Sequence, residues 1–250
     1  MLHGRTLLLL LLLAEVGHAD SLTVAVASNF ARPAHELAER FEKTSGHELR
    51  ITTASTGKLY AQIENGAPFD ILLAADKERP LLLEESGLGV AGSRFTYAVG
   101  SLVLWSRDPA LSNADCRAQL DKLGKKRLAI ANPATAPYGV AALQFLQAAG
   151  AWEAVQPRLV FGENIAQTLH FVASGNASLG LIATAQARDA RLPESTCHWP
   201  VPRSMHEALE HQVILLERAS GKKAATDFLA YLRTGDARDV ITANGYEMDN

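Results

Sequence analysis

The alternation of β-type and helix-type segments constrains this chain more than any other feature of its sequence. Runs rich in β-branched residues are followed by stretches whose apolar residues recur at every third or fourth position. In the first part of the chain, strands and helices are predicted in turn at residues 22–27, 34–41, 49–53, 59–63, 70–75 and 78–86. This order predicts an α/β lobe: a mainly parallel sheet flanked by helices on both faces.

The second part of the chain repeats the same order. Strands and helices are predicted in turn at residues 127–131, 138–149, 158–161, 165–173 and 179–183. Short β-branched runs separated by helix-length segments again indicate βαβ units. The sequence therefore predicts two α/β lobes rather than one large sheet, with a ligand cleft between them.

Two segments are predicted to connect the lobes. Residues 95–105 are too long and too apolar for a loop, so we expect a strand that runs from one lobe into the other, with residues 211–217 as its return partner. The C-terminal helices, near residues 222–232 and 236–244, are expected on the first lobe. The predicted division is lobe I at residues 20–99 plus 202–250, and lobe II at residues 100–201.

The N-terminus has the three-part layout of a secretory signal peptide. A short basic start at residues 1–5 precedes a leucine run at 6–14, and small residues flank His18. The leucine run is far shorter than the roughly 20 residues that cross a bilayer, which disfavours a membrane anchor. We expect cleavage after Ala19, no lipid anchor, and a soluble periplasmic product.

Charge and cysteine content narrow the partners and the compartment. The formal net charge is −3 and there is no basic cluster, so nucleic acid is not an expected partner. We expect a monomer. Cys116 and Cys197 are the two cysteines, and an exported chain favours a disulfide between them, with two buried free thiols as the alternative.

Polar residues follow the predicted strands where helices begin, which is where open parallel sheets bind ligands. The four junctions are Ser28-Asn29, Ser55-Thr56-Gly57, residues 132–138 and residues 163–165. Free backbone N–H groups and the positive end of the helix dipole point outward at such starts. Each junction alone is compatible with simple helix capping, but two per lobe, facing each other, would form an anion site without a cation.

Enzymatic and metal-binding alternatives are weaker. Ser55 and Lys58 fit the S-x-x-K spacing of exported serine acyl-transferring enzymes, but the companion motifs are poor and no K-T-G occurs. Lys58 is expected inside its helix, facing solvent. His206 and His211 lack metal-ligand spacing. Carboxylates at both ends of the third strand, Asp70 and Asp76, are interpreted as strand-end and cap residues.

Five stretches resemble the periplasmic molybdate-binding proteins of ABC importers, a family of type II solute-binding proteins. They are VAVASNF (24–30), ITTASTGKLYAQIENGAPFDILLAAD (51–76), SRFTYAVGSLVLWS (93–106), ANPATAPYG (131–139) and LGLIATAQA (179–187). The resemblance covers nearly all of the chain after residue 19. It implies a periplasmic-binding-protein-like fold, a non-enzymatic binding function, a small oxyanion as ligand, and the membrane permease of an ABC importer as partner.

Carried over by position, the family's ligand contacts fall on Ser28, Asn29, Thr56, Tyr138 and Ile165. Thr56 replaces the usual serine and keeps its hydroxyl. Many relatives place a tyrosine where this chain has Ala183-Thr184, so Tyr138 is expected to supply that hydroxyl from another direction.

The resemblance implies molybdate or tungstate as ligand and no cofactor, and the metal would be reached only through its oxygens. A site made only of donors suits a fully deprotonated dianion, which has no proton to give, and disfavours phosphate, which carries a proton at neutral pH. Sulfate remains an open alternative.

Overall fold

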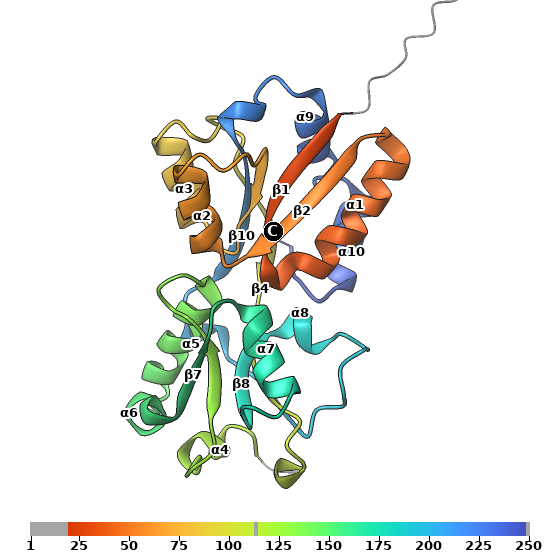
Figure 1. The fold of residues 1–250 in the computed structure, drawn as a ribbon. Helices are drawn as coiled ribbons and strands as arrows, with labels where there is room; N and C mark the ends of the chain where they lie inside the picture. The colour runs from red at the N-terminus through yellow and green to blue at the C-terminus, as the bar shows by residue number, and fades with distance from the viewer. Residues whose placement is uncertain (1–19, 113–114, 249–250) are drawn as a thin grey trace, which may run out of the picture.

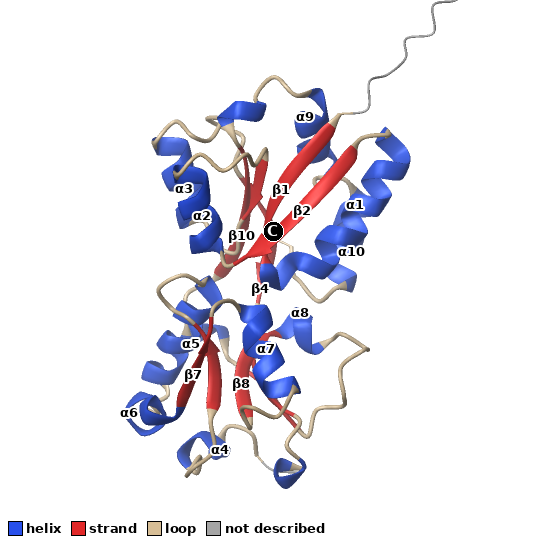
Figure 2. Cartoon of the chain, viewed as in Figure 1, coloured by secondary structure: helices blue, strands red, loops and turns tan. Residues whose placement is uncertain are grey.

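The computed structural model describes residues 20–112 and 115–248, so the predicted signal peptide at residues 1–19 lies outside the described residues. The described chain forms two lobes, one above the other in Figure 1, each with one five-stranded sheet. Helices cover both faces of each sheet (Figure 2). The predicted two-lobed α/β fold is therefore confirmed.

The sheet of lobe I has the strand order β2-β1-β3-β10-β4. Its strands are β1 (Ser21–Ala27), β2 (Glu48–Ala54), β3 (Ile71–Leu73), β4 (Phe95–Gly100) and β10 (Leu209–Leu215). Strands β2, β1 and β3 are parallel, as the βαβ pattern predicts, whereas β10 is antiparallel to both β3 and β4. The antiparallel pairs arise because β4 and β10 carry the chain between the lobes in opposite directions.

Side chains alternate across this sheet and bury two helical layers. Leu22, Val24 and Val26 of β1 pack with one group of helices, and Ala25 packs with the other. The first group is α1 (Ala31–Ser45), α9 (Lys223–Tyr231) and α10 (Gly235–Ala243), and the second is α2 (Thr56–Glu64) and α3 (Glu78–Glu85). The C-terminal helices thus pack on lobe I, as predicted.

The sheet of lobe II has the strand order β7-β6-β8-β5-β9. Its strands are β5 (Leu102–Ser106), β6 (Leu128–Ala131), β7 (Leu159–Gly162), β8 (Leu179–Ala183) and β9 (Cys197–Pro200). Strands β7, β6 and β8 are parallel, and β5 pairs antiparallel with β8 and β9. The sequence pattern did not predict β9, a short strand that forms one edge of the sheet.

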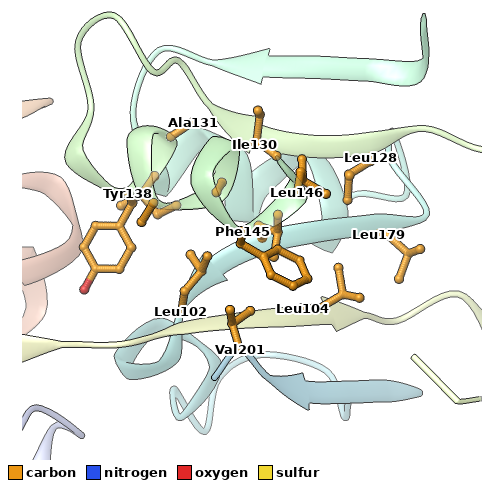
Figure 3. Close-up of a cluster of buried hydrophobic side chains, with 14 of the residues drawn as sticks. Leu102, Leu104, Leu128, Ile130, Ala131, Tyr138, Phe145, Leu146, Leu179 and Val201 are labelled. Carbon is orange, nitrogen blue, oxygen red and sulfur yellow. The ribbon is translucent and has the colours of Figure 1, made fainter. Parts of the chain in front are cut away.

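Helices cover lobe II in the same way. The longer ones are α5 (Pro137–Ala148) and α7 (Ile165–Ala173), and one-turn helices occur at α4 (Ala118–Asp121), α6 (Trp152–Val155) and α8 (Thr184–Ala187). The larger hydrophobic cluster lies between the sheet and α5, with Phe145 and Leu146 at its centre and Tyr138 at its edge (Figure 3). Val172 of α7 packs on the opposite face.

The predicted crossing strand at residues 95–105 is two strands in two sheets. Strand β4 ends at Gly100 and β5 begins at Leu102, so one residue separates the two sheets. The return path runs from β9 in lobe II to β10 in lobe I, and β10 pairs with β4. The exact division at residues 99 and 201 stays a prediction, but both crossing paths are present.

Cys116 and Cys197 form the disulfide that the sequence favours, with their Cα atoms 5.4 Å apart. The bond joins the segment before α4 to the start of β9, and both sulfur-bearing residues are buried in the core of lobe II. It therefore constrains lobe II internally and does not link the lobes. No helix in the described ranges is long and apolar enough to span a membrane.

Candidate functional site

A small cavity lies where the two lobes meet. The lining residues come from the ends of strands and the beginnings of helices in both lobes: Ala27, Ser28, Asn29, Ser55, Thr56, Ala75, Ala136, Pro137, Tyr138 and Ile165. All five residues predicted to bind the ligand are in this set. The cavity measures about 10 Å³, which is room for about one water-sized sphere. Their binding role itself stays a prediction.

Four helices begin beside the cavity. Helix α1 follows the 3₁₀ turn η1 (Ser28–Phe30), α2 begins at Thr56, α5 at Pro137 and α7 at Ile165. The first turn of a helix carries unpaired backbone N–H groups and about half a positive charge. An anion at this point would face two such helix starts from each lobe.

The hydroxyls of α2 differ in their hydrogen bonding. Thr56 Oγ1 accepts a hydrogen bond from the backbone N–H of Ala75 at 3.0 Å, so its own proton remains available for a ligand. The Ser55 hydroxyl occupies the N-cap position but forms no cap bond, and its oxygen is buried with no hydrogen-bond partner among the described residues. The cavity therefore offers two hydroxyl donors from adjacent residues of lobe I.

The side chain of Asn29 belongs to a buried polar network. Its amide nitrogen lies 3.1 Å from Tyr246 Oη and 3.5 Å from His211 Nδ1. The other ring nitrogen, His211 Nε2, lies 3.5 Å from Tyr138 Oη. Because the amide is engaged there, the backbone N–H of Asn29 is the group that would meet a ligand.

Every titratable group of this network is electrically neutral near pH 7. Burial lowers the pKa of His211 to about 3. Burial also raises the pKa of Tyr138 and of Tyr246 well above the usual tyrosine range. No Lys or Arg lines the cavity in the part of the chain that the structure describes. The site therefore combines helix dipoles with neutral donors.

The charged residues lie at the rim and pair across the cleft. Lys58 Nζ lies 2.7 Å from Glu163 Oε2, and this ion pair joins α2 of lobe I to the segment before α7 of lobe II. The Lys58 side chain is 44% exposed, so it faces solvent as expected, and it also forms an ion pair with Glu163 that the sequence did not predict. That hydrogen bond lowers the pKa of Glu163.

The same ion pair argues against the serine-enzyme alternative. A catalytic lysine must reach the serine hydroxyl that it activates. Lys58 instead contacts Glu163, and no hydrogen bond joins it to Ser55 within residues 20–112 and 115–248. The S-x-x-K spacing therefore does not form a nucleophile–base pair here.

A backbone hydrogen bond also crosses the cleft. The N–H of Gly57 donates to the carbonyl oxygen of Thr135 at 2.9 Å. A Cβ atom at Gly57 would lie 2.8 Å from that oxygen and 3.1 Å from the Thr135 Cα. Glycine at this position thus allows the backbones of the two lobes to touch.

A wider groove adjoins the cavity and shares Ser28 and Asn29 with it. The groove measures about 280 Å³ and runs between α1 and the region of α8. Arg32 lies 3.6 Å from Asp189 across it. The hydrogen bond from Arg191 lowers the pKa of Asp189 to about 2, which keeps this carboxylate charged at the mouth of the cleft.

The remaining candidates have structural roles. Asp70 accepts a hydrogen bond from the backbone of Thr23 and pairs with Lys222. Asp76 caps the turn before α3 by accepting from the backbone N–H of Arg79. The strand-end and cap interpretation of these carboxylates is confirmed. Across the described ranges no group of three or more His, Cys, Asp and Glu side chains is placed to hold a metal ion.

Two further positions considered from the sequence, Asn164 and the pair Ala183-Thr184, lie outside the cavity lining. Asn164 is the N-cap of α7, and its side chain accepts a hydrogen bond from the backbone N–H of Gln167 at 3.0 Å, so it is a capping residue. Ala183 and Thr184, where the resemblance implies a tyrosine, do not line the cavity, whereas Tyr138 does.

His211 and Tyr246 were not predicted from the sequence as parts of the site. His211 was considered as the beginning of a return strand and rejected as a metal ligand, and Tyr246 follows the last helix. The one available signal was an ionisable residue close to the apolar run 213–215 of its strand, because a buried ionisable group requires a polar partner. Gly57 and Glu163 were also named only as local features.

Comparison with known proteins gives consistent results. Residues 22–247 match a family model described as bacterial extracellular solute-binding protein. The chain is 45% identical over 236 residues to the molybdate-binding protein ModA of Azotobacter vinelandii, covering 94% of this chain and 93% of that protein. It is 38% identical over 244 residues to ModA of Rhodobacter capsulatus, covering 97% and 95%.

A solved structure agrees with these relatives. The periplasmic molybdate-binding protein of Azotobacter vinelandii superimposes with a TM-score of 0.84 at 36% identity. The match covers 92% of this chain and 100% of the solved chain. Both lobes and the crossing strands are therefore shared, and these relatives are binding proteins rather than enzymes.

Proposed function

The chain belongs to the bacterial extracellular solute-binding proteins, and we propose that it captures molybdate or tungstate between its lobes and delivers the anion to an ABC importer. The observation that carries the proposal is the convergence of four helix starts, two from each lobe, on one cavity lined by neutral donors. Relatives of the same length and fold carry the name of molybdate-binding proteins.

The proposed contacts are hydroxyls and backbone N–H groups. Ser28, Thr56 and Tyr138 would donate through hydroxyls, and Asn29 and Ile165 through backbone N–H. The Ser55 hydroxyl is a further donor at the same wall, since it is buried and unpartnered among the described residues. Charge-assisted hydrogen bonds of this kind are roughly twice as strong as neutral ones.

The donor set also bears on which anion binds. No carboxylate lines the cavity among the described residues, so a proton on the anion would find no carboxylate acceptor. Dianions without a proton, such as molybdate, tungstate and sulfate, therefore suit the site better than phosphate. The relatives whose names state molybdate binding support molybdate or tungstate, rather than sulfate, as the proposed ligand.

We further propose that the protein acts as a periplasmic monomer after cleavage behind Ala19, without nucleic acid. Its expected partner is the permease of an ABC importer, because solute-binding proteins of this family deliver their ligand to one. Mass spectrometry of the exported protein should show a chain that begins at Asp20.

Titration calorimetry with molybdate, tungstate, sulfate and phosphate tests the proposed function. We expect tight binding of the first two anions and far weaker binding of the others. A matching thermal shift should accompany binding, because ligand at 1,000 times Kd stabilises the folded state by about 4 kcal/mol. Sulfate affinity within about tenfold of molybdate, a difference of about 1.4 kcal/mol, would overturn the assignment.

A further inference from the structure

His211 contacts two of the proposed ligand residues, Asn29 and Tyr138, without lining the cavity itself. It is fully buried on β10, one of the strands that cross between the lobes. The pairing of β10 with β4 shifts register between His211 and Gln212, and such irregularities re-aim side chains near functional sites. Gly100 of β4 keeps the adjacent space open, because a Cβ there would collide with the Tyr138 hydroxyl.

The imidazole ring connects one proposed ligand contact from each lobe. Nδ1 faces the Asn29 amide of lobe I and Nε2 faces the Tyr138 hydroxyl of lobe II, each at 3.5 Å. The rings of Tyr97, Tyr138 and Tyr246 surround the imidazole, with centroids 5.3 to 5.9 Å away. The neighbouring titratable groups are thus phenols.

The hydrogen bonds around Asn29 determine which imidazole nitrogen carries the proton. Tyr246 O–H donates to the backbone carbonyl of Asn29 at 2.8 Å, and a carbonyl can only accept. The Tyr246 oxygen must therefore accept from Asn29, which places the amide nitrogen, and not the amide oxygen, at 3.1 Å from it. The same NH₂ group faces His211 Nδ1, so Nδ1 must be the unprotonated acceptor.

A neutral imidazole with an unprotonated Nδ1 carries its proton on Nε2. The pKa of His211, lowered to about 3 by burial, is consistent with a neutral ring. The Nε2–H then points at Tyr138 Oη, which must accept this hydrogen bond. With one lone pair of its oxygen engaged in this way, Tyr138 can direct its own proton elsewhere.

We propose that His211 is a positioning residue: its Nε2–H donates to Tyr138 Oη and thereby directs the phenolic proton of Tyr138 into the cavity, toward the bound oxyanion. This inference rests on the proposed function. With the opposite tautomer, Nε2 would be an acceptor and Tyr138 would donate its single proton to His211 instead. The anion would then lose one hydrogen bond.

Nitrogen-15 NMR of the ring tests the proton position directly, in the wild-type protein with and without molybdate. We expect the spectrum of His211 to show a protonated Nε2 and an unprotonated Nδ1 in both states. Protonation at Nδ1 would overturn the proposal. The measurement without molybdate remains decisive if the protein binds a different anion, so it separates this proposal from the proposed function.

Variants test the effect on binding. His211→Leu removes both ring contacts, and molybdate binding should weaken roughly tenfold or more. His211→Gln offers one acceptor and one donor, as the neutral ring does, and should restore affinity to within about threefold of wild type. The matched control, His198→Gln on the exposed side of β9, should leave binding unchanged.

The double variant separates positioning from simple packing. In a Tyr138→Phe background the hydroxyl is absent, so His211→Leu should then cost less than about threefold. An equal loss from His211→Leu in both backgrounds would show that the residue acts only through packing, and would overturn the proposal. If His211→Leu does not fold, the NMR measurement and the comparison of His211→Gln with wild type still decide.

Discussion

At the scale of single residues, the donors of the cavity are held by hydrogen bonds that leave their protons free. Thr56 illustrates this arrangement, because its oxygen accepts from the backbone of Ala75 while its proton is uncommitted. Tyr138 lines the cavity from the edge of the lobe II core, with its ring buried and its hydroxyl 3.5 Å from His211 Nε2. Each hydroxyl is thus pre-positioned by groups that a ligand need not move.

Removing one hydroxyl should therefore weaken binding, and Thr56→Val should also cost about 1–3 kcal/mol of stability because the buried N–H of Ala75 loses its acceptor. Thr56→Val and Tyr138→Phe keep the side-chain shape, and each should lose one hydrogen bond to a charged ligand, worth about 1.5–3 kcal/mol. Calorimetry should show molybdate binding roughly 10- to 150-fold weaker. Thr184→Val, outside the cavity, is the control. Unchanged affinity in both cavity variants would contradict the neutral-donor site.

Lys58 provides the contrasting case of a charged residue at the rim. Its ion pair with Glu163 is largely exposed, and exposed pairs contribute about 0.2–1 kcal/mol. Lys58→Ala and Glu163→Gln should each weaken molybdate binding by no more than about fivefold, and less at high salt. Calorimetry at two salt concentrations measures this. Loss of all binding in Lys58→Ala would mean that the cation is part of the site.

At the scale of elements, the beginnings of helices meet backbone to backbone across the cleft. The first turn of α2 donates from Gly57 to the carbonyl of Thr135, just before α5 begins. This contact joins the lobes at the cavity wall, so it is available only when the lobes are close together. A helix start here both faces the ligand and holds the cleft closed.

Gly57→Ala should separate helix stability from closure. Alanine favours a helix over glycine by about 1 kcal/mol, but its Cβ would press on the Thr135 backbone, 2.8 Å from the oxygen. We expect unchanged or higher stability without ligand, and molybdate binding weakened by roughly tenfold or more. Gly235→Ala, whose Cβ meets nothing within 4 Å, is the control. Equal affinity in Gly57→Ala and wild type would refute the closure role.

At the scale of the whole molecule, the disulfide and the buried histidine affect stability more than ligand choice. The bond between Cys116 and Cys197 closes a loop with a sequence separation of 81 residues inside lobe II. Replacing both cysteines with serine should destabilise the protein by about 2–4 kcal/mol in urea unfolding. The preference among oxyanions should not change, and a changed order of affinities would show that lobe II transmits strain to the site.

The buried histidine predicts how stability depends on pH. The pKa of His211 is about 3 in the folded protein, against 6.5 for an unperturbed side chain. As the pH falls, the unfolded chain therefore binds a proton at this histidine before the folded protein does. The contribution of neutral His211 to the free energy of unfolding is complete above pH 6.5 and is lost toward pH 3. The slope approaches about 1.4 kcal/mol per pH unit.

Urea unfolding at several pH values between these limits measures the slope. His211→Gln, which has no titrating group at this position, should show a shallower decline on acidification than wild type. Identical slopes in the two proteins would mean that His211 binds a proton as readily in the folded protein as in the unfolded chain, against a lowered pKa in the folded state.

The sequence by itself determined the order of the elements and the place where the chemistry gathers. β-branched runs and helical spacing are local patterns, so they predicted β1, α1, β2 and the repeat in lobe II. The polar residues at strand ends, such as Ser28 and Thr56, indicated the cavity because parallel strands end at one edge of a sheet. The pair of cysteines in an exported chain favoured the disulfide that forms.

Only the tertiary structure decided which distant groups meet. His211 and Asn29 are 182 positions apart, and Tyr246 and Asn29 are 217 apart, so their contacts depend on strand register and on the angle between the lobes. The same holds for Lys58 with Glu163 and for Gly57 with Thr135, which join opposite walls of the cleft. No local pattern encodes these pairs, because a hydrogen bond forms only within about 3.5 Å and chain distance does not set spatial distance.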